Sequence, residues 1–207
     1  HDMESYIIEL KEKYNVRGLF IDDENFGSDK KQSYQVARIM KKHDIFWSAG
    51  GVRCKSVTYE DLKHYKDHNM LSIRFGIESG SQKILDIMEK KFTVEDVKKA
   101  VFTAYDVGLN SHPGAFMVGM PGKTINTAID SGKLMGEIAA HARVPVGLQQ
   151  KYMDLCYALP LVGTPLYEYS QQIGVIGDTL EEEEDYLYRT ADTMEDRGIL
   201  NYLNKTE

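Results

Sequence analysis

The chain has 207 residues, a length that suits one large domain or two small ones and excludes a multi-domain assembly. Its 25 Lys and Arg residues against 32 Asp and Glu residues give a net charge of −7, which disfavours a broad nucleic-acid or anionic-membrane surface. No apolar run reaches the ~18 residues that a membrane span needs. The two cysteines, Cys54 and Cys156, exclude a disulfide framework and indicate a reducing compartment, the cytoplasm.

Helical and strand-like segments alternate along the chain, which predicts βα units around a parallel sheet. Apolar spacing predicts helices at residues 4–14, 33–42, 59–68, 82–88, 94–107 and 125–138. Apolar runs that end in turn residues predict strands at residues 18–21, 45–49, 70–77, 115–118 and 152–159. The first strand shows no polar alternation, so we expect it to be buried on both faces. In the first helix, Tyr6, Ile7, Leu10 and Tyr14 share the apolar face.

The last third of the chain is predicted to be mainly helical. Pro165 opens a short helix, and Thr179 with Glu182 forms a capping box for another. The acidic run 181–185 is typical of a solvated helix start, where carboxylates favour the helix dipole. The tail to Glu207 is expected to fray. We predict a core domain over residues 1–174 and a helical extension over residues 175–207.

Polar residues and glycines collect where the predicted strands end, which is where parallel α/β folds bind ligands. These are Asp22, Asp23, Glu24 and Asn25 after the first strand, Arg53 after the second, Glu78 and Ser79 after the third, and the turns 119–122 and 159–163 after the fourth and fifth. Such an edge suits a zwitterion that carries a ribose. The structural alternative is that Asp22 and Asp23 cap the next helix and that Arg53 pairs with Glu78.

Three other patterns carry weaker signals. Residues 119–124 imitate a phosphate loop, but Met117 stands where that loop needs a glycine. His64 and His68 have the spacing of two metal ligands, yet no acid lies between them in the protease pattern, which favours a surface pair. Cys54 follows Arg53, and because one thiol cannot hold an iron–sulfur cluster we expect it to be a small buried residue.

Four segments resemble, in this order and spacing, the radical S-adenosylmethionine (SAM) enzymes: residues 20–26 (FIDDENF), 75–85 (FGIESGSQKIL), 116–124 (FMVGMPGKT) and 163–167 (GTPLY). The most similar branches are the cobalamin-binding one, which includes the anaerobic magnesium-protoporphyrin IX monomethyl ester oxidative cyclases, and the related methylthiotransferases. The resemblance covers residues 4 to about 174. It implies an α/β fold, a parallel (βα) partial TIM-type barrel with about five of its six strands present.

The family binds a [4Fe–4S] cluster on a CxxxCxxC loop after the first barrel strand, and this sequence has no such loop. The resemblance therefore implies a fragment without the first strand and the loop, inactive by itself. For the whole enzyme it implies SAM, the cluster, cobalamin in this branch, an external electron donor and a small-molecule substrate. Reductive cleavage of SAM would give a 5′-deoxyadenosyl radical, or the enzyme would methylate or cyclise its substrate with cobalamin.

The resemblance assigns cofactor-binding roles to nine residues at the strand ends and no catalytic or metal-ligating role. They are Asp22, Asp23 and Asn25 for the methionine amino group, Arg53, Glu78 and Ser79 for the methionine carboxylate and the ribose, and Met117, Gly119 and Met120 for the adenine. The carboxylates of the first group would also attract an ammonium on physical grounds.

Two other hypotheses stay open from the residues. One is an α/β barrel enzyme without iron that uses Asp23 and Glu78 as an acid–base pair. The other is a degenerate barrel that serves as an interaction module. If the first barrel strand is missing, the edge of the strand at residues 18–21 is exposed, and we expect self-association through that edge.

Overall fold

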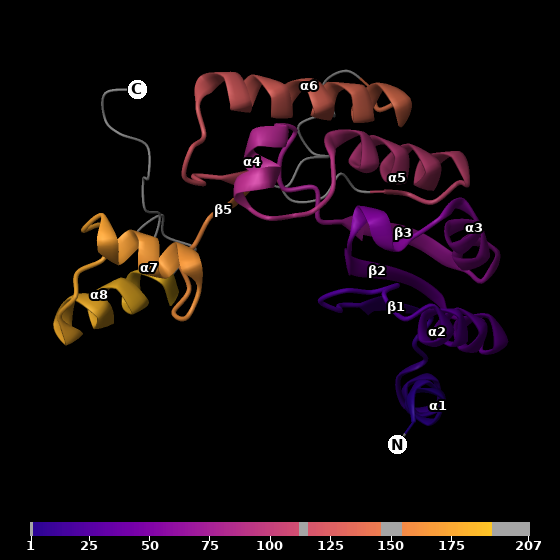
Figure 1. Ribbon diagram of the computed structural model, residues 1–207. Coiled ribbons are helices and arrows are strands. Elements are labelled where there is room, and N and C mark those ends of the chain that lie inside the picture. Colours follow the sequence, from indigo (N-terminus) through magenta and orange to yellow (C-terminus); the bar gives the residue numbers. More distant parts are fainter. Residues whose placement is uncertain (1, 112–115, 146–154, 192–207) are drawn as a thin grey trace. The chain divides into compact units, whose positions relative to one another are not determined.

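The computed structural model describes residues 2–111, 116–145 and 155–191 (Figure 1). The chain divides into two compact units, His1–Phe116 with Asn126–Asp154, and Met117–Ile125 with Leu155–Glu207, and each is described by itself. The elements are α1 (Met3–Tyr14), β1 (Gly18–Ile21), α2 (Lys30–Lys42), β2 (Phe46–Val52), the 3₁₀ turn η1 (Cys54–Ser56), α3 (Tyr59–Asp67), β3 (Met70–Phe75), α4 (Gln82–Ile87), α5 (Val94–Asp106), β4 (Phe116–Val118), α6 (Ile125–His141), β5 (Leu155–Tyr157), α7 (Pro165–Gln172) and α8 (Leu180–Ala191).

The first unit is built around a parallel sheet in the order β1-β2-β3. The expected α/β class with parallel strands is therefore confirmed. β1 pairs with β2 in unbroken register from Gly18 opposite Phe46 to Ile21 opposite Ala49. The pairing of β2 with β3 shifts between Ala49 and Val52, so the end of β2 bulges at the edge where a ligand would bind.

One face of this sheet packs against α2, α3 and α5, which lie on the same side of the strands (Figure 1). Trp47, the only tryptophan of the chain, is 1% exposed in this core, and its ring donates to the carbonyl oxygen of His68 at 2.7 Å. The opposite face carries Phe20, which is 54% exposed. The prediction that β1 is buried on both faces is therefore wrong, because the described helices of this unit cover only one face of the sheet.

Local sequence signals explain where the helices begin. Asp29 caps α2, accepting from the backbone N–H of Gln32, so this helix starts three residues earlier than expected. Thr58 and Thr93 form capping boxes for α3 and α5. In α1 only Ile7 is buried while Tyr6 and Tyr14 are exposed, so the predicted apolar face of this helix makes less core contact than expected.

The second unit pairs β4 with β5 and adds α7 and α8. Ala158 donates its backbone N–H to Val118 at 2.8 Å, and the amine of Lys123 donates to the carbonyl oxygen of Met117, which closes the turn after β4. Thr179 and Glu182 form the expected capping contacts. The expected fraying tail beyond residue 191 and the expected strand residues 115 and 152–154 lie outside the described residues. The boundary at residue 174 stays a prediction.

Tyr167, Ile176 and Tyr186 form a small core of their own in this unit, and the hydroxyl of Tyr186 donates to Pro160. Throughout the described segments, no helix is both long enough and apolar enough to cross a bilayer.

His64 makes the packing of α3 against α2 sensitive to pH. Its ring stacks on Tyr34 with centroids 4.0 Å apart, and burial lowers the pKa of His64, as do the positive charges of His68 and Arg38. The unfolded chain therefore binds a proton at His64 more readily than the folded chain does. Stability is fully present above the unfolded pKa, near 6.5, and falls as the pH drops toward the lower folded pKa.

We predict that His64→Phe, which keeps a ring against Tyr34 but cannot titrate, makes stability less dependent on pH. Urea unfolding followed by Trp47 fluorescence at pH 7.5 and pH 5.5 measures this dependence in the first unit. The loss of stability at the lower pH should be smaller in the variant than in the wild type. An equal loss in both proteins would contradict the prediction.

Candidate functional site

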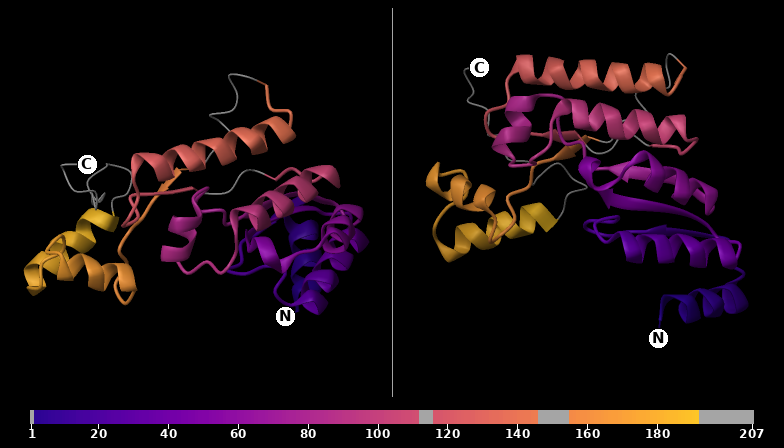
Figure 2. Two further views of the ribbon diagram at one scale, coloured as in Figure 1. Left: turned by 45° about the horizontal axis from the view of Figure 1, so that its top comes forward. Right: turned by 45° about the vertical axis from the view of Figure 1, so that its right-hand side comes forward.

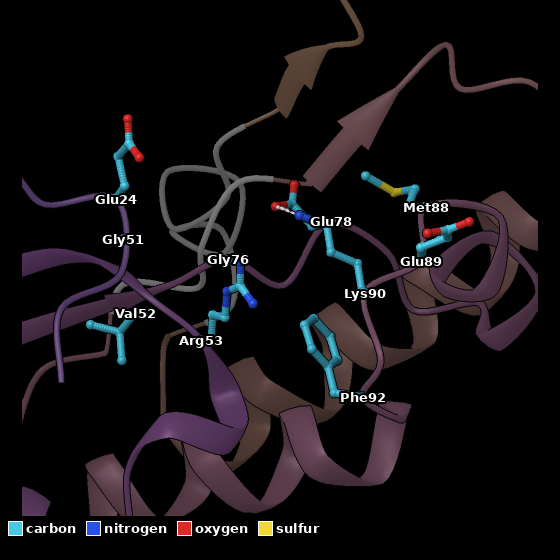
Figure 3. A pocket seen from close by; sticks show the side chains of 10 residues that line it. All are labelled: Glu24, Gly51, Val52, Arg53, Gly76, Glu78, Met88, Glu89, Lys90 and Phe92. Carbon is cyan, nitrogen blue, oxygen red and sulfur yellow. Dashed lines mark hydrogen bonds and ion pairs between the residues drawn. The ribbon is translucent and has the colours of Figure 1, made fainter. Parts of the chain in front are cut away.

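A cavity of about 320 Å³ opens at the carboxyl ends of β2 and β3, and we call it the strand-end cavity (Figure 3). Its volume lies within the range of ligand pockets, roughly 300–1,000 Å³. It is lined by Glu24, Gly51, Val52, Arg53, Gly76, Glu78, Met88, Glu89, Lys90 and Phe92. The structure thus brings together three of the polar residues predicted at the strand ends, Glu24, Arg53 and Glu78, and the last two also have a cofactor-binding role assigned by the resemblance.

Gly51 lets the chain after β1 reach this cavity. Its φ is +68°, and a Cβ built at this position would lie 1.6 Å from the carbonyl oxygen of Asp23. No side chain fits there, so only glycine allows the backbone of residues 23–24 to lie directly against the bulge of β2. Glu24, one of the polar residues expected at the strand ends, is thereby placed on the wall of the cavity, although the resemblance assigns it no cofactor-binding role.

Glu78 occupies a strained backbone position at the end of β3. Its φ is +64°, and the backbone N–H of Ser79 donates to the carbonyl oxygen of Ile77 at 2.7 Å, which closes a γ-turn around Glu78. A parallel bridge also joins Glu78 to Phe116. A left-handed, non-glycine residue costs about 1–3 kcal/mol and persists where the surroundings hold it, often at functional sites.

Lys90 binds the carboxylate of Glu78. The amine of Lys90 contacts this carboxylate (Figure 3), 2.7 Å from Oε1. The Lys90 side chain is 31% exposed and the Glu78 side chain is 16% exposed. The flanking residues Glu89 and Lys91 have φ values of +52° and +58°, and Lys55 donates to the carbonyl oxygen of Lys91 at 3.4 Å. The chain after α4 therefore curves around the cavity and presents Lys90 to it.

Sequence reasoning missed Lys90. A loop lysine 12 positions after Glu78 (90 − 78) carries no periodic or spacing signal of its own. Only the two left-handed residues beside it, which sequence does not reveal, turn it inward.

Arg53 follows β2 with extended backbone geometry and lines the same cavity. Among the described residues, the guanidinium of Arg53 makes no hydrogen bond or ion pair. The carboxylate of Glu78 is bound by Lys90 instead. The structural alternative that Arg53 pairs with Glu78 therefore does not hold. A guanidinium without a partner beside a cavity is suited to bind a carboxylate in bidentate fashion.

Ser79 is fully buried, and its hydroxyl faces α6 rather than the cavity. It lies 3.3 Å from the hydroxyl of Ser131 and accepts from the backbone N–H of Ser81 at 3.1 Å. Gly80 donates to Ser131 at 3.0 Å, and a Cβ on Gly80 would lie 2.6 Å from the backbone of α6. This network anchors the turn that carries Glu78. The structure therefore shows Ser79 supporting that turn rather than lining the cavity.

The acidic residues after β1 are divided between two places. Asp23 and Asn25 line a different pocket, of about 150 Å³, near the starts of α1 and α2, whereas Asp22 is exposed. Asp23 accepts from the backbone N–H of Asn25 at 2.8 Å, and Oδ1 of Asn25 is buried without a partner among the described residues. Asp29, not Asp22 or Asp23, caps α2.

Met117, Gly119 and Met120 belong to the second unit, and their contacts are described within it. Gly119 has a φ of +83°, and the backbone N–H of Lys123 donates to Met120 at 3.2 Å, as expected of a tight turn. Their assigned role at the adenine stays a prediction.

The cysteines do not fit an iron–sulfur cluster. Burial raises the pKa of the Cys54 thiol to about 12, with a smaller contribution from nearby Asp96, so this side chain stays a thiol. Cys54 is buried, as expected, while Cys156 is exposed in β5. Two thiols cannot supply three thiolates. Within the described residues, no group of three or more His, Cys, Asp or Glu side chains is placed to hold a metal ion.

The donor set of the strand-end cavity does fit SAM. Arg53, which has no partner in the described part of the chain, suits the methionine carboxylate. The carboxylate of Glu24 suits an ammonium, and Glu78 can accept hydrogen bonds from ribose hydroxyls. The fold and this cavity together define an α/β protein with a polar ligand site at the ends of parallel strands.

Comparison with known proteins identifies the family. Residues 2–135, more than half of the chain, match the Radical SAM superfamily. The chain belongs to the radical SAM superfamily, and the resemblance noted in the sequence is confirmed at that level. The match does not specifically support the magnesium-protoporphyrin cyclase branch.

Two curated relatives are methyltransferases by name. The chain is 29% identical over 175 residues to an uncharacterized methyltransferase, PH0819, of Pyrococcus horikoshii, a match that covers 82% of this chain and 36% of the relative. It is 23% identical over 202 residues to cytidylyl-2-hydroxyethylphosphonate methyltransferase of Streptomyces wedmorensis, covering 97% and 35%. The chain thus spans about a third of the length of these relatives.

The fold is similar to a solved structure of OxsB, a cobalamin-dependent SAM radical enzyme with aqua-cobalamin and SAM bound. The TM-score is 0.62 at 16% identity, over 98% of this chain and 34% of OxsB. At this identity the likeness shows the fold alone.

Proposed function

We propose that this chain is the SAM-binding core of a radical SAM methyltransferase that works with cobalamin. The observation that carries the proposal is the strand-end cavity, which is lined by strained Glu78, its partner Lys90 and Arg53, a guanidinium that has no partner among the described residues. The names of the two curated relatives support methyl transfer. The proposal assigns the cluster thiolates to a part of the protein outside these 207 residues. It also places the protein in the cytoplasm.

Each cavity residue has a distinct role in this proposal. Arg53 binds and orients the methionine carboxylate, and Glu24, which also lines the cavity, attracts the methionine ammonium. Glu78 accepts hydrogen bonds from the ribose hydroxyls, and Lys90 fixes the direction of the Glu78 carboxylate. When bound, SAM supplies a methyl group or, after reductive cleavage, a radical that abstracts hydrogen from the substrate. The chain contributes binding and orientation, which place the reacting carbon reproducibly.

The acid–base alternative finds no support in the geometry. Asp23 and Glu78 line different pockets, so they do not face a common substrate position. Proton transfer would require both groups within hydrogen-bonding reach of one ligand.

We predict that Glu78→Gln and Arg53→Gln each weaken SAM binding at least tenfold. A hydrogen bond to a charged group contributes roughly 1.5–3 kcal/mol, and about 1.4 kcal/mol corresponds to a factor of ten. Anaerobic calorimetric titration of the whole, cluster-loaded protein measures this affinity. Asp23→Asn serves as an internal comparison, and it should change the affinity less than either cavity variant because Asp23 lies outside the cavity.

The matched control is Glu60→Gln, which removes an exposed carboxylate of α3 outside the strand-end cavity. This variant should bind SAM within about twofold of the wild type, as expected for a surface charge. If Glu78→Gln and Arg53→Gln also bound SAM within twofold of the wild type, the assignment of this cavity would have to be withdrawn.

A further inference from the structure

Helix α2 has an unusual charge for this acidic protein. It carries five cations in 13 residues, Lys30, Lys31, Arg38, Lys41 and Lys42, and no acidic residue. Each of the other described α-helices contains at least one Asp or Glu. The chain as a whole has a net charge of −7, so α2 stands out as a positive element.

Three of these cations lie on one exposed face. Lys31, Arg38 and Lys42 are 7 and 11 positions apart (38 − 31 and 42 − 31), which puts them on the same side of the helix. We call them the basic face of α2. At 1.5 Å per residue, the face extends for about 16 Å. Among the described residues, Lys31 and Arg38 have no ion-pair partner, whereas Lys42 lies 2.7 Å from Glu4 and is still 68% exposed.

The stability of the fold does not explain this face. Lys31 stands in the first turn of α2, where the helix dipole disfavours a cation, and it lacks the acidic partner that Lys30 has in Asp61. Arg38 adds a positive charge near His64, and this charge lowers the pKa of His64 in addition to the effect of burial. Neither cation therefore has a stabilising ion pair among the described residues, which leaves both charges available to a partner.

We propose that the basic face of α2 is the docking surface for an acidic one-electron carrier protein. The inference rests on the proposed function, because reductive cleavage of SAM consumes one electron, which the reduced carrier loses as it is oxidised. α2 begins directly after the loop that leaves the carboxyl end of β1, so a carrier on its first turns lies at the edge of the sheet that bears the strand-end cavity. Electron-transfer complexes typically have small interfaces and are transient, and complementary charges steer the encounter of the two proteins.

The test uses an acidic flavodoxin as the probe and the chain without any cofactor. Binding is measured by NMR titration at about 20 mM and about 300 mM NaCl. The higher salt concentration shortens the Debye length and so screens the attraction between the two charged surfaces. We expect binding at low salt that weakens at least tenfold at high salt. Lys31→Glu with Arg38→Glu should reduce binding at low salt at least tenfold.

The matched control is Lys83→Glu with Lys133→Glu, which changes the net charge by the same amount on α4 and α6. It should bind within about twofold of the wild type. Equal weakening in both double variants, or no binding at low salt, would overturn the proposal. A 20-nucleotide RNA that binds the same face more tightly than flavodoxin would also overturn it.

These outcomes are separable from a failure of the proposed function. Docking is read out without SAM or a cluster, whereas the SAM titration uses the loaded whole protein and no carrier. A chain that binds flavodoxin through α2 while Glu78→Gln leaves SAM affinity unchanged would keep the docking surface and reject the cavity assignment.

Discussion

Gly51→Ala is expected to lower the stability of the first unit by about 3 kcal/mol. The added Cβ would lie 1.6 Å from the carbonyl oxygen of Asp23, and the φ of +68° is strained for any other residue. A left-handed alanine alone costs about 1–3 kcal/mol, and the forced movement of backbone adds an overpacking cost of similar size. Because the neighbour is backbone rather than a flexible side chain, no rotamer change relieves the clash.

Urea unfolding followed by Trp47 fluorescence measures this effect, since the only tryptophan is buried in the core of the first unit and reports its unfolding. The same variant should also impair SAM binding, because the backbone of residues 23–24 positions Glu24 at the cavity. Gly132→Ala is the matched control. A Cβ on Gly132, within α6, meets nothing within 4 Å, so this change should be neutral or stabilise by up to about 1 kcal/mol. Equal stability of the two variants would contradict the prediction.

Asp61→Asn is expected to destabilise the contact between α2 and α3 by about 2–3 kcal/mol. The Asp61 carboxylate accepts from the amine of Lys30, from the hydroxyl of Tyr34 at 2.9 Å and from the backbone N–H of Thr58 at 2.7 Å. Its side chain is only 7% exposed. The neutral amide would leave the Lys30 ammonium without its counter-charge, and hydrogen bonds to a charged group contribute roughly 1.5–3 kcal/mol.

The sign of the pH dependence follows from the same contacts. Burial by itself would raise the pKa of Asp61, but hydrogen bonds from Lys30, Thr58 and Tyr34 together hold it below its usual value. The stabilisation is thus complete above the unfolded pKa, near 3.9, and is lost as the pH falls through the lower folded pKa. Urea unfolding between pH 7 and pH 3 should show a shallower acid dependence in Asp61→Asn than in the wild type.

The control for this variant is Asp67→Asn, which removes a carboxylate that pairs with Lys63 on the exposed side of α3. Solvent screens that pair, so little stability should be lost. Equal destabilisation by both changes would mean that Asp61 acts as an ordinary surface charge.

The sequence predicted the elements of the fold well because the signals involved are local. Capping boxes, apolar spacing and turn glycines act within a few residues, and the parallel arrangement of β1, β2 and β3 follows from βα alternation. The solvent exposure of Phe20 was not predictable from its own segment. Which face of a sheet is covered depends on elements that are distant in the sequence.

The candidate site could be predicted only in part from the sequence, because it also depends on contacts between distant segments. Arg53 and Glu78 could be placed at one edge because parallel strands end together, and the structure confirms that they share a cavity. Glu24 lines that cavity, whereas the resemblance assigns the methionine amino group to Asp23 and Asn25. This arrangement depends on the close approach of the backbone of residue 23 to Gly51, a three-dimensional contact that the sequence does not reveal. Lys90 reaches Glu78 only because Glu89 and Lys91 adopt left-handed conformations.

The γ-turn at Glu78 has a consequence for engineering. Glycine adopts a φ of +64° without strain, so Glu78→Gly would relax the backbone while deleting the carboxylate. A laboratory selection for heat resistance alone would then reward loss of the ligand site, because relief of this backbone strain comes at a residue that the site needs. Directed evolution of this protein should therefore select for binding and stability together, and thermostable isolates should be sequenced first at residue 78.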